Sequence, residues 1–135
     1  MNTRVVSYLR CEPSRLERDD HDFLHCKFVL IAWSDCRYFV VGSITDFRYH
    51  ANLVERFCDE QGLVSAWVQR PDLLEVVDPE VRVAGGGHLE INPHGRRMKC
   101  FGVSKAYGVF KGREVAEIAN QHSFFDDYRL TFAKF

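Results

Sequence analysis

The segment Tyr49-His50-Ala51 has the clearest chemical potential in this sequence. It stands where an amphipathic helix is expected to begin, and the free N–H groups and positive dipole end of a helix start favour a bound anion. The same helix end keeps a nearby imidazole neutral, and a general base for water attack on a phosphoryl group must be neutral. The alternative is a partly buried histidine that packs against a sheet and has no chemical role.

A second candidate is the run Ser104-Lys105-Ala106-Tyr107-Gly108, between an expected strand and an expected helix. Such a loop can present consecutive backbone N–H groups to an anion, together with a hydroxyl and an ammonium group. Its alternative is an ordinary connection that ends in glycine. Lys27 opens an otherwise apolar strand. A lone charge there usually reaches solvent, but it can equally supply positive charge to a phosphoryl group.

The glycine triplet Gly85-Gly86-Gly87 allows positive φ values and close approach of the backbone to a neighbour or ligand. We expect it to form a β-bulge in a bent strand. The chain lacks a Gly-x-Gly-x-x-Gly motif and the Lys-Ser/Thr ending of a nucleotide loop, which argues against a nucleotide site.

The five cysteines are scattered, odd in number and without a Cys-x-x-Cys pair, which favours reduced thiols over a disulfide framework or a zinc ribbon. None is followed six positions later by arginine, which excludes the cysteine-nucleophile phosphatase loop. His21, His25 and Cys26 lie close in sequence, but no second ligand pair stands at a convincing spacing. We therefore expect no metal and no cofactor.

Two helices are expected to position these residues. The first runs from about Arg48 to Gln61, with Thr45 or Asp46 as its N-cap and Gly62 at its end. Apolar residues at three- and four-residue spacing give it one face for packing on a sheet, with His50 at the rim of the core. The second helix spans about residues 111–121.

The predicted strands are 5–10, 27–33, 38–42, 64–68, 81–84, 89–91, 97–103 and 128–132, while 73–77 is left open between a strand and a helical turn. Residues 11–22 are expected to form a surface loop. The whole is predicted to be a single domain over residues 1–135 of the α/β (α+β) class, with a mixed sheet of about six strands flanked by two α-helices.

The composition limits the partners. The net charge of −1 and the pI near 6.6 give no global field that would attract nucleic acid or an acidic membrane, so an anionic substrate needs a local pocket. The longest apolar run, Phe28 to Trp33, is too short to cross a bilayer, and the N-terminus has no signal-peptide core. We expect a cytoplasmic monomer.

Taken together, these motifs resemble the phosphohistidine phosphatase (Janus/Ocnus) family. The resemblance spans from about residue 26 to the end and rests on Tyr-His-Ala, the glycine triplet and Ser-x-Ala-Tyr-Gly in this order. The matching pieces are Lys27-Phe28-Val29-Leu30-Ile31, Tyr49-His50-Ala51, Gly85-Gly86-Gly87, Ser104-Lys105-Ala106-Tyr107-Gly108 and Asp127-Tyr128-Arg129-Leu130-Thr131.

The resemblance implies a metal-independent phosphatase that hydrolyses the phosphoramidate P–N bond of a phosphohistidine-containing protein or peptide. The family's catalytic histidine falls on His50, as general base or nucleophile, and its phosphate-binding lysine on Lys27. Its phosphate loop corresponds to Ser104 and Ala106, and Ala51 adds a backbone N–H beside Tyr49. The implied fold, a mixed sheet flanked by two helices, agrees with the element count.

Three departures from the family pattern bear on the substrate. Residues 63–80 look like an insertion, His88 replaces the arginine that commonly follows the glycines, and Lys105 replaces a neutral residue in the phosphate loop. We count His88 and Lys105 as substrate-binding positions. The departures motivate two alternatives: a non-catalytic member that binds phosphoprotein or another anion, and a phosphoramidase acting on phospholysine or small phosphoramidates.

Overall fold

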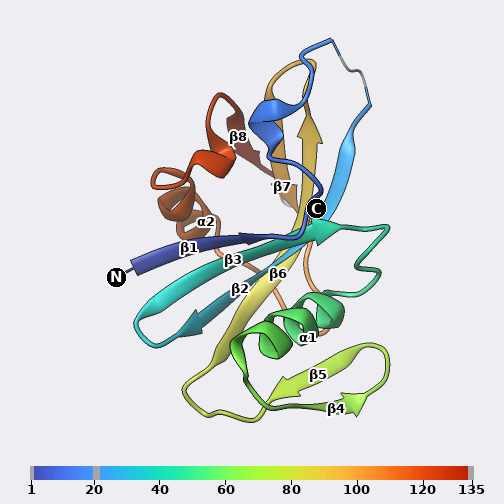
Figure 1. The fold of residues 1–135 in the computed structure, drawn as a ribbon, viewed down its shortest axis with the longest axis vertical. Coiled ribbons are helices and arrows are strands. Elements are labelled where there is room, and N and C mark those ends of the chain that lie inside the picture. Colours follow the sequence, from blue (N-terminus) through green and yellow to red (C-terminus); the bar gives the residue numbers. More distant parts are fainter. Residues whose placement is uncertain (1, 20–21, 134–135) are drawn as a thin grey trace.

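The computed structural model describes residues 2–19 and 22–133. Its main element is a curled mixed sheet of six strands in the order β1-β3-β2-β6-β7-β8 (Figure 1). The outermost strands, β1 and β8, pair parallel to their neighbours, and the inner strands pair antiparallel. The bounds are β1 Asn2–Ser7, β2 Leu24–Trp33, β3 Cys36–Ser43, β6 Arg82–Asn92, β7 Arg97–Phe101 and β8 Arg129–Phe132. The predicted α+β class and six-stranded mixed sheet are confirmed.

Two helices, α1 (His50–Gln61) and α2 (Gly112–Ala119), cover opposite faces of this sheet (Figure 1). Successive strand side chains point to opposite faces, so β2 divides its residues between two cores. Phe28 packs in the core that includes the buried side chains of α2, and Val29 packs in the core that includes those of α1. Full burial of a Phe or Val side chain contributes about 1.5–3 kcal/mol, which explains why β2 is apolar on both faces.

The start of α1 differs from the prediction. The helix begins at His50, Tyr49 is its N-cap in extended conformation, and the Tyr49 N–H donates to Asn52 Oδ1 at 3.0 Å. The expectation that Thr45 or Asp46 caps the helix is wrong, because those residues lie in a turn closed by the Phe47 N–H bond to Ser43 O. The predicted end is confirmed.

The glycine triplet lies inside one continuous strand, β6, which replaces the two shorter strands predicted there. Gly86 pairs with Val29 and Val83 pairs with Ile31, so two residues of β6 stand opposite one residue of β2. This is the predicted bulge. Gly85 in the bulge has φ +120°, a conformation that side chains with a Cβ rarely adopt.

Residues 63–80 contain a small second sheet of two strands, β4 (Ser65–Gln69) and β5 (Leu73–Val76). The segment left open at 73–77 is therefore a strand. This hairpin packs on α1, since Leu74 is 1% exposed in the same core as Phe57 (Figure 1). The predicted surface loop at 11–22 includes a 3₁₀ turn, Pro13–Arg15, and a second turn lies at Ser123–Phe125.

Four of the five cysteines are buried and free, and Cys11 is exposed. Burial raises the pKa of Cys26 and Cys100 to about 12, so both remain thiols at neutral pH. Within residues 2–19 and 22–133, no group of three or more His, Cys, Asp or Glu side chains gathers as metal ligands would. His21, which we considered with His25 and Cys26, lies outside the described residues. No described helix is long and apolar enough to cross a membrane.

Candidate active site

His50 is the first residue of α1, and its ring lies against the glycine strand β6. A Cβ on Gly86 would come within 3.1 Å of His50 Cδ2 and 2.6 Å of Phe28 O, so only glycine leaves room for the ring there. His50 Nε2 lies 2.9 Å from Gly87 O. A carbonyl oxygen only accepts hydrogen bonds, so Nε2 carries the proton and Nδ1 keeps its lone pair.

The pKa of His50 is lowered to about 4, chiefly by burial and to a smaller extent by the nearby Lys27 and His88, while the bond to Gly87 O acts in the opposite direction. The residue is 8% exposed. The imidazole is therefore neutral at pH 7, as expected from the sequence, although burial is the main cause and not the helix dipole.

This pKa makes the stability of the protein depend on pH. The unfolded chain, in which the pKa of His50 is about 6.5, takes up a proton below that pH, and the folded chain does so only near pH 4. We therefore expect the free energy of unfolding to fall by about 2–3 kcal/mol between pH 6.5 and 4 through this residue. Urea denaturation at pH 7 and 4.5 measures it.

His50→Gln is the comparison for that measurement, because glutamine can keep the hydrogen bond to Gly87 O without titrating. Its stability should depend less on pH than that of the wild type over the same range. The pKa of His88, also lowered chiefly by burial, contributes a dependence of the same sign that both proteins share. Identical pH dependence in the two proteins would contradict the lowered pKa of His50.

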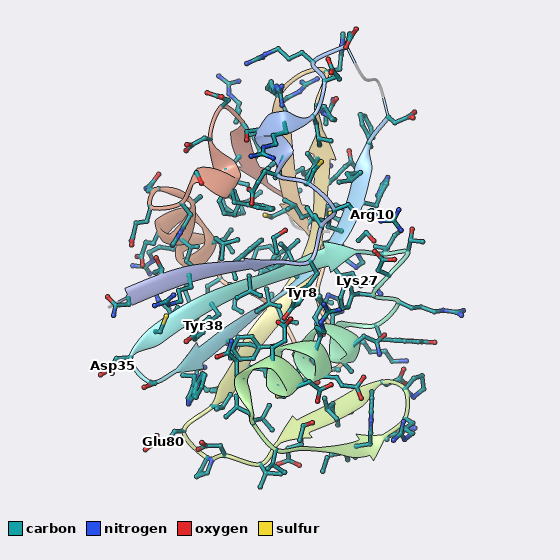
Figure 2. All side chains as sticks on the ribbon, in the orientation of Figure 1. Tyr8, Arg10, Lys27, Asp35, Tyr38 and Glu80 are labelled. Atoms are coloured by element: carbon teal, nitrogen blue, oxygen red, sulfur yellow. The ribbon has the colours of Figure 1, made fainter. Side chains whose placement is uncertain are left out.

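Lys27 and His88 lie directly opposite each other on the antiparallel strands β2 and β6, so their side chains share the face that α1 covers. Lys27 lies near the start of α1 (Figure 2). Its ammonium donates to Arg48 O just before that helix, and it lies 5.8 Å from the centroid of the Tyr49 ring. Burial, followed by the charge of Arg48, lowers the pKa of Lys27. Lys27 thus places a positive charge at the start of the helix.

The loop Ser104–Gly108 is closed on itself. Ser104 N–H donates to Gly108 O at 3.1 Å, and Gly108 N–H donates to Ser104 O at 2.7 Å. The Ser104 hydroxyl oxygen accepts the Tyr107 N–H at 3.0 Å, which leaves its O–H proton for another acceptor. The N–H groups of Lys105 and Ala106 find no acceptor in the described part of the chain. The loop can therefore offer several donors to an anion.

These elements meet around one cavity of about 290 Å³. All the predicted site residues except Ala51 line it: Lys27, Tyr49, His50, His88, Ser104, Lys105 and Ala106. The Ala51 side chain is fully buried, so only its backbone N–H is available for the predicted role. The rings of His50 and His88 stand edge to face with centroids 5.6 Å apart. A histidine at the start of the first helix thus shares a cavity with the loop that leads into the second helix.

Asp72 and Val103 also line the cavity, and sequence reasoning missed both. Asp72 comes from the turn between β4 and β5. The Tyr107 hydroxyl holds that hairpin in place, since it donates to Leu74 O at 2.6 Å and accepts the Leu74 N–H at 3.3 Å. Burial raises the pKa of Tyr107 to about 12, so the hydroxyl keeps its proton. No local sequence pattern around Asp72 indicates that this residue lines a cavity.

The cavity and the elements from β2 to α2 fall within the part of the chain that a known family describes. The family model of the Janus/Ocnus family matches residues 22–129, a range that includes every predicted site residue and Asp72. The chain belongs to the Janus/Ocnus family. No curated protein matches it.

Proposed function

We propose that this protein is a metal-independent phosphatase that hydrolyses the P–N bond of phosphohistidine in a protein or peptide. The observation that carries the proposal is one cavity lined by a neutral histidine, a lysine and a loop with free backbone donors. Membership of the Janus/Ocnus family supports it. The buried, free thiols favour a reducing compartment, so we further propose that it acts in the cytoplasm, as a monomer.

In the proposed mechanism, donors around the cavity bind the phosphoryl oxygens. Lys27, the Ser104 hydroxyl and the N–H groups of Lys105 and Ala106 stabilise the charge that develops in the transition state, and this is usually the largest catalytic contribution. The first N–H groups of α1, including that of Ala51, have no acceptor within the helix and can add to the set. Because these donors are fixed before substrate binds, they need little reorganisation.

His50 then removes a proton from the attacking water. Its Nδ1 accepts the proton, and the Gly87 carbonyl, bonded to Nε2–H, holds the tautomer and stabilises the imidazolium that forms. A bound phosphoryl dianion raises the basicity of the ring above that in the empty cavity. Direct attack of the same nitrogen on phosphorus is the covalent variant, and it would leave a phosphorylated His50.

A ³¹P NMR time course with phosphohistidine, phospholysine and phosphoserine peptides tests the proposal. We expect inorganic phosphate from the phosphohistidine peptide at a rate well above spontaneous hydrolysis, and an unchanged rate after addition of a chelator. A faster reaction with phospholysine would reassign the substrate to the related phosphoramidase class. A rate abolished by the chelator would contradict the metal-independent mechanism.

One observation favours a second function, non-catalytic binding of a phosphorylated protein. His50 is 8% exposed and has a pKa of about 4, which makes it a weak base in the empty site. In that case the same cavity binds phosphohistidine peptides or phosphate without consuming them. Calorimetric binding together with an unchanged ³¹P spectrum would identify this function.

A further inference from the structure

Asp72 is the one carboxylate among the described residues that line the cavity. The other ionisable lining groups include Lys27, Lys105, His50 and His88. In a cavity that binds only a phosphoryl dianion, a carboxylate would weaken binding, because like charges at short range repel each other. The position of Asp72 therefore needs a separate explanation.

Asp72 is half-buried, and contacts of a nearby residue fix its position. It stands two residues before Leu74, whose N–H and C=O are both bonded to the Tyr107 hydroxyl of the phosphate loop. Leu74 itself is anchored in the core at 1% exposure. The turn that carries Asp72 is thereby fixed relative to the loop that carries Ser104, Lys105 and Ala106.

The cations at the cavity leave this carboxylate unpaired. The Lys27 ammonium donates to Arg48 O, and Lys105 is exposed. Across residues 2–19 and 22–133, the ion pairs within 4.0 Å involve Arg37 and Arg56 with glutamates, and none involves Asp72. A partner for the Asp72 carboxylate can therefore come from the ligand.

A phosphoramidate supplies such a partner, and a phosphate ester does not. Its leaving group is protonated before the P–N bond breaks, so a cation stands beside the phosphoryl group. In phospholysine the bridging nitrogen carries this charge, and in phosphohistidine the imidazolium ring carries it and offers an N–H on its second nitrogen. The oxygen of phosphoserine is neutral.

We propose that Asp72 binds the protonated leaving group and so selects phosphoramidates over phosphate esters. This inference rests on the proposed function and adds a substrate-discriminating residue from the hairpin 63–80. In the step itself, water oxygen bonds to phosphorus and its proton passes to His50. The P–N bond breaks, its electron pair returns to nitrogen, and the leaving group departs as a neutral amine or imidazole.

The test compares two ligands of nearly equal shape, aminomethylphosphonate and ethylphosphonate, titrated by calorimetry. They differ in an ammonium and a methyl group beside the phosphonate. We expect the wild type to bind the amino ligand about ten-fold more tightly and Asp72→Asn to lose that preference. Because every variant meets the same two ligands, differences in the ligands' own ionisation cancel between variants.

Glu75→Gln is the matched control, since Glu75 is an exposed residue of β5 in the same hairpin and does not line the cavity, so the change removes the same charge outside the site. It should keep the wild-type preference. Equal preference in Asp72→Asn and the wild type, or no preference in the wild type, overturns the inference. Equal tightening of both ligands in Asp72→Asn also overturns it, because the carboxylate would then only weaken anion binding.

Turnover is measured separately, so failure of the proposed phosphatase function can be distinguished from failure of the proposed role of Asp72. If the preference for the amino ligand depends on Asp72 but phosphohistidine peptide is not hydrolysed, the recognition role stands and the proposed enzymatic function is wrong. If the peptide is hydrolysed and Asp72→Asn releases phosphate from phosphohistidine and phosphoserine peptides in the wild-type ratio, the function stands and the role of Asp72 is wrong. Failure of both phosphonates to bind contradicts the recognition role of Asp72, while hydrolysis of the peptide still decides the proposed function.

Discussion

Replacing His50 by glutamine is expected to slow phosphate release from a phosphohistidine peptide by about 10²–10⁴-fold, the usual contribution of a general base. Glutamine can donate to Gly87 O as the Nε2–H of His50 does, so the contact with β6 is kept. Its amide cannot take up a proton from water near neutral pH. The loss should therefore fall on kcat, while phosphate binding through Lys27 and the Ser104–Gly108 loop changes little.

The control is His94→Gln, the same change at an exposed histidine that does not line the cavity. It should retain the wild-type rate. Circular dichroism and urea denaturation at pH 7 establish that His50→Gln is folded. A folded His50→Gln protein that hydrolyses the peptide at the wild-type rate would remove His50 from the mechanism.

Alkaline quench and mass spectrometry of the wild type separate general-base from covalent catalysis, because only the covalent route yields phosphorylated protein.

Gly85→Ala is expected to reduce the free energy of unfolding by about 2–4 kcal/mol. Two causes add. The residue has φ +120°, and a Cβ built there lies 2.2 Å from Val109 O and 2.7 Å from its carbonyl carbon, so backbone must move. The neighbouring Gly86 N–H bond to Gly108 O joins the bulge to the phosphate loop. The shift should therefore also lower catalytic activity in the protein that remains folded.

Gly62→Ala separates the clash from the conformational cost. Gly62 has φ +71° at the end of α1, and a Cβ there meets no atom within 4 Å. Only the left-handed conformation is penalised, at about 1 kcal/mol. Urea denaturation of both variants measures the difference. Equal destabilisation of the two proteins would show that the clash with Val109 costs little, because the backbone there moves to accommodate a side chain at Gly85.

The fold was largely predictable because its strands and helices carry strong local patterns. Phe28–Trp33 is apolar on both faces, as a central strand between two helices must be, and α1 shows helical spacing that ends at Gly62. The N-cap of α1 was not predictable from Thr45 and Asp46, since a turn after β3 takes up these residues. Which of several capping candidates is used depends on the preceding strand.

The candidate site also has a part that the sequence predicted and a part that it did not. His50 and the loop at Ser104 stand at element ends that local sequence marks, and Lys27 is a charged residue beside the apolar run of β2. The cavity brings all three together. Asp72 could not be found this way. Its place depends on a contact between Tyr107 and Leu74, 33 positions apart, and on a hairpin whose second strand the sequence left open between a strand and a helical turn.

The bond between Tyr107 and Leu74 has a consequence for protein engineering. Excising residues 63–80 to obtain a shorter relative of this chain would strip the Tyr107 hydroxyl of both partners and uncover the surface of α1 beneath Leu74. Grafting the hairpin onto another scaffold would meet the converse difficulty, because its turn is oriented by a tyrosine that the graft leaves behind. The two segments form a single module and must be transplanted together.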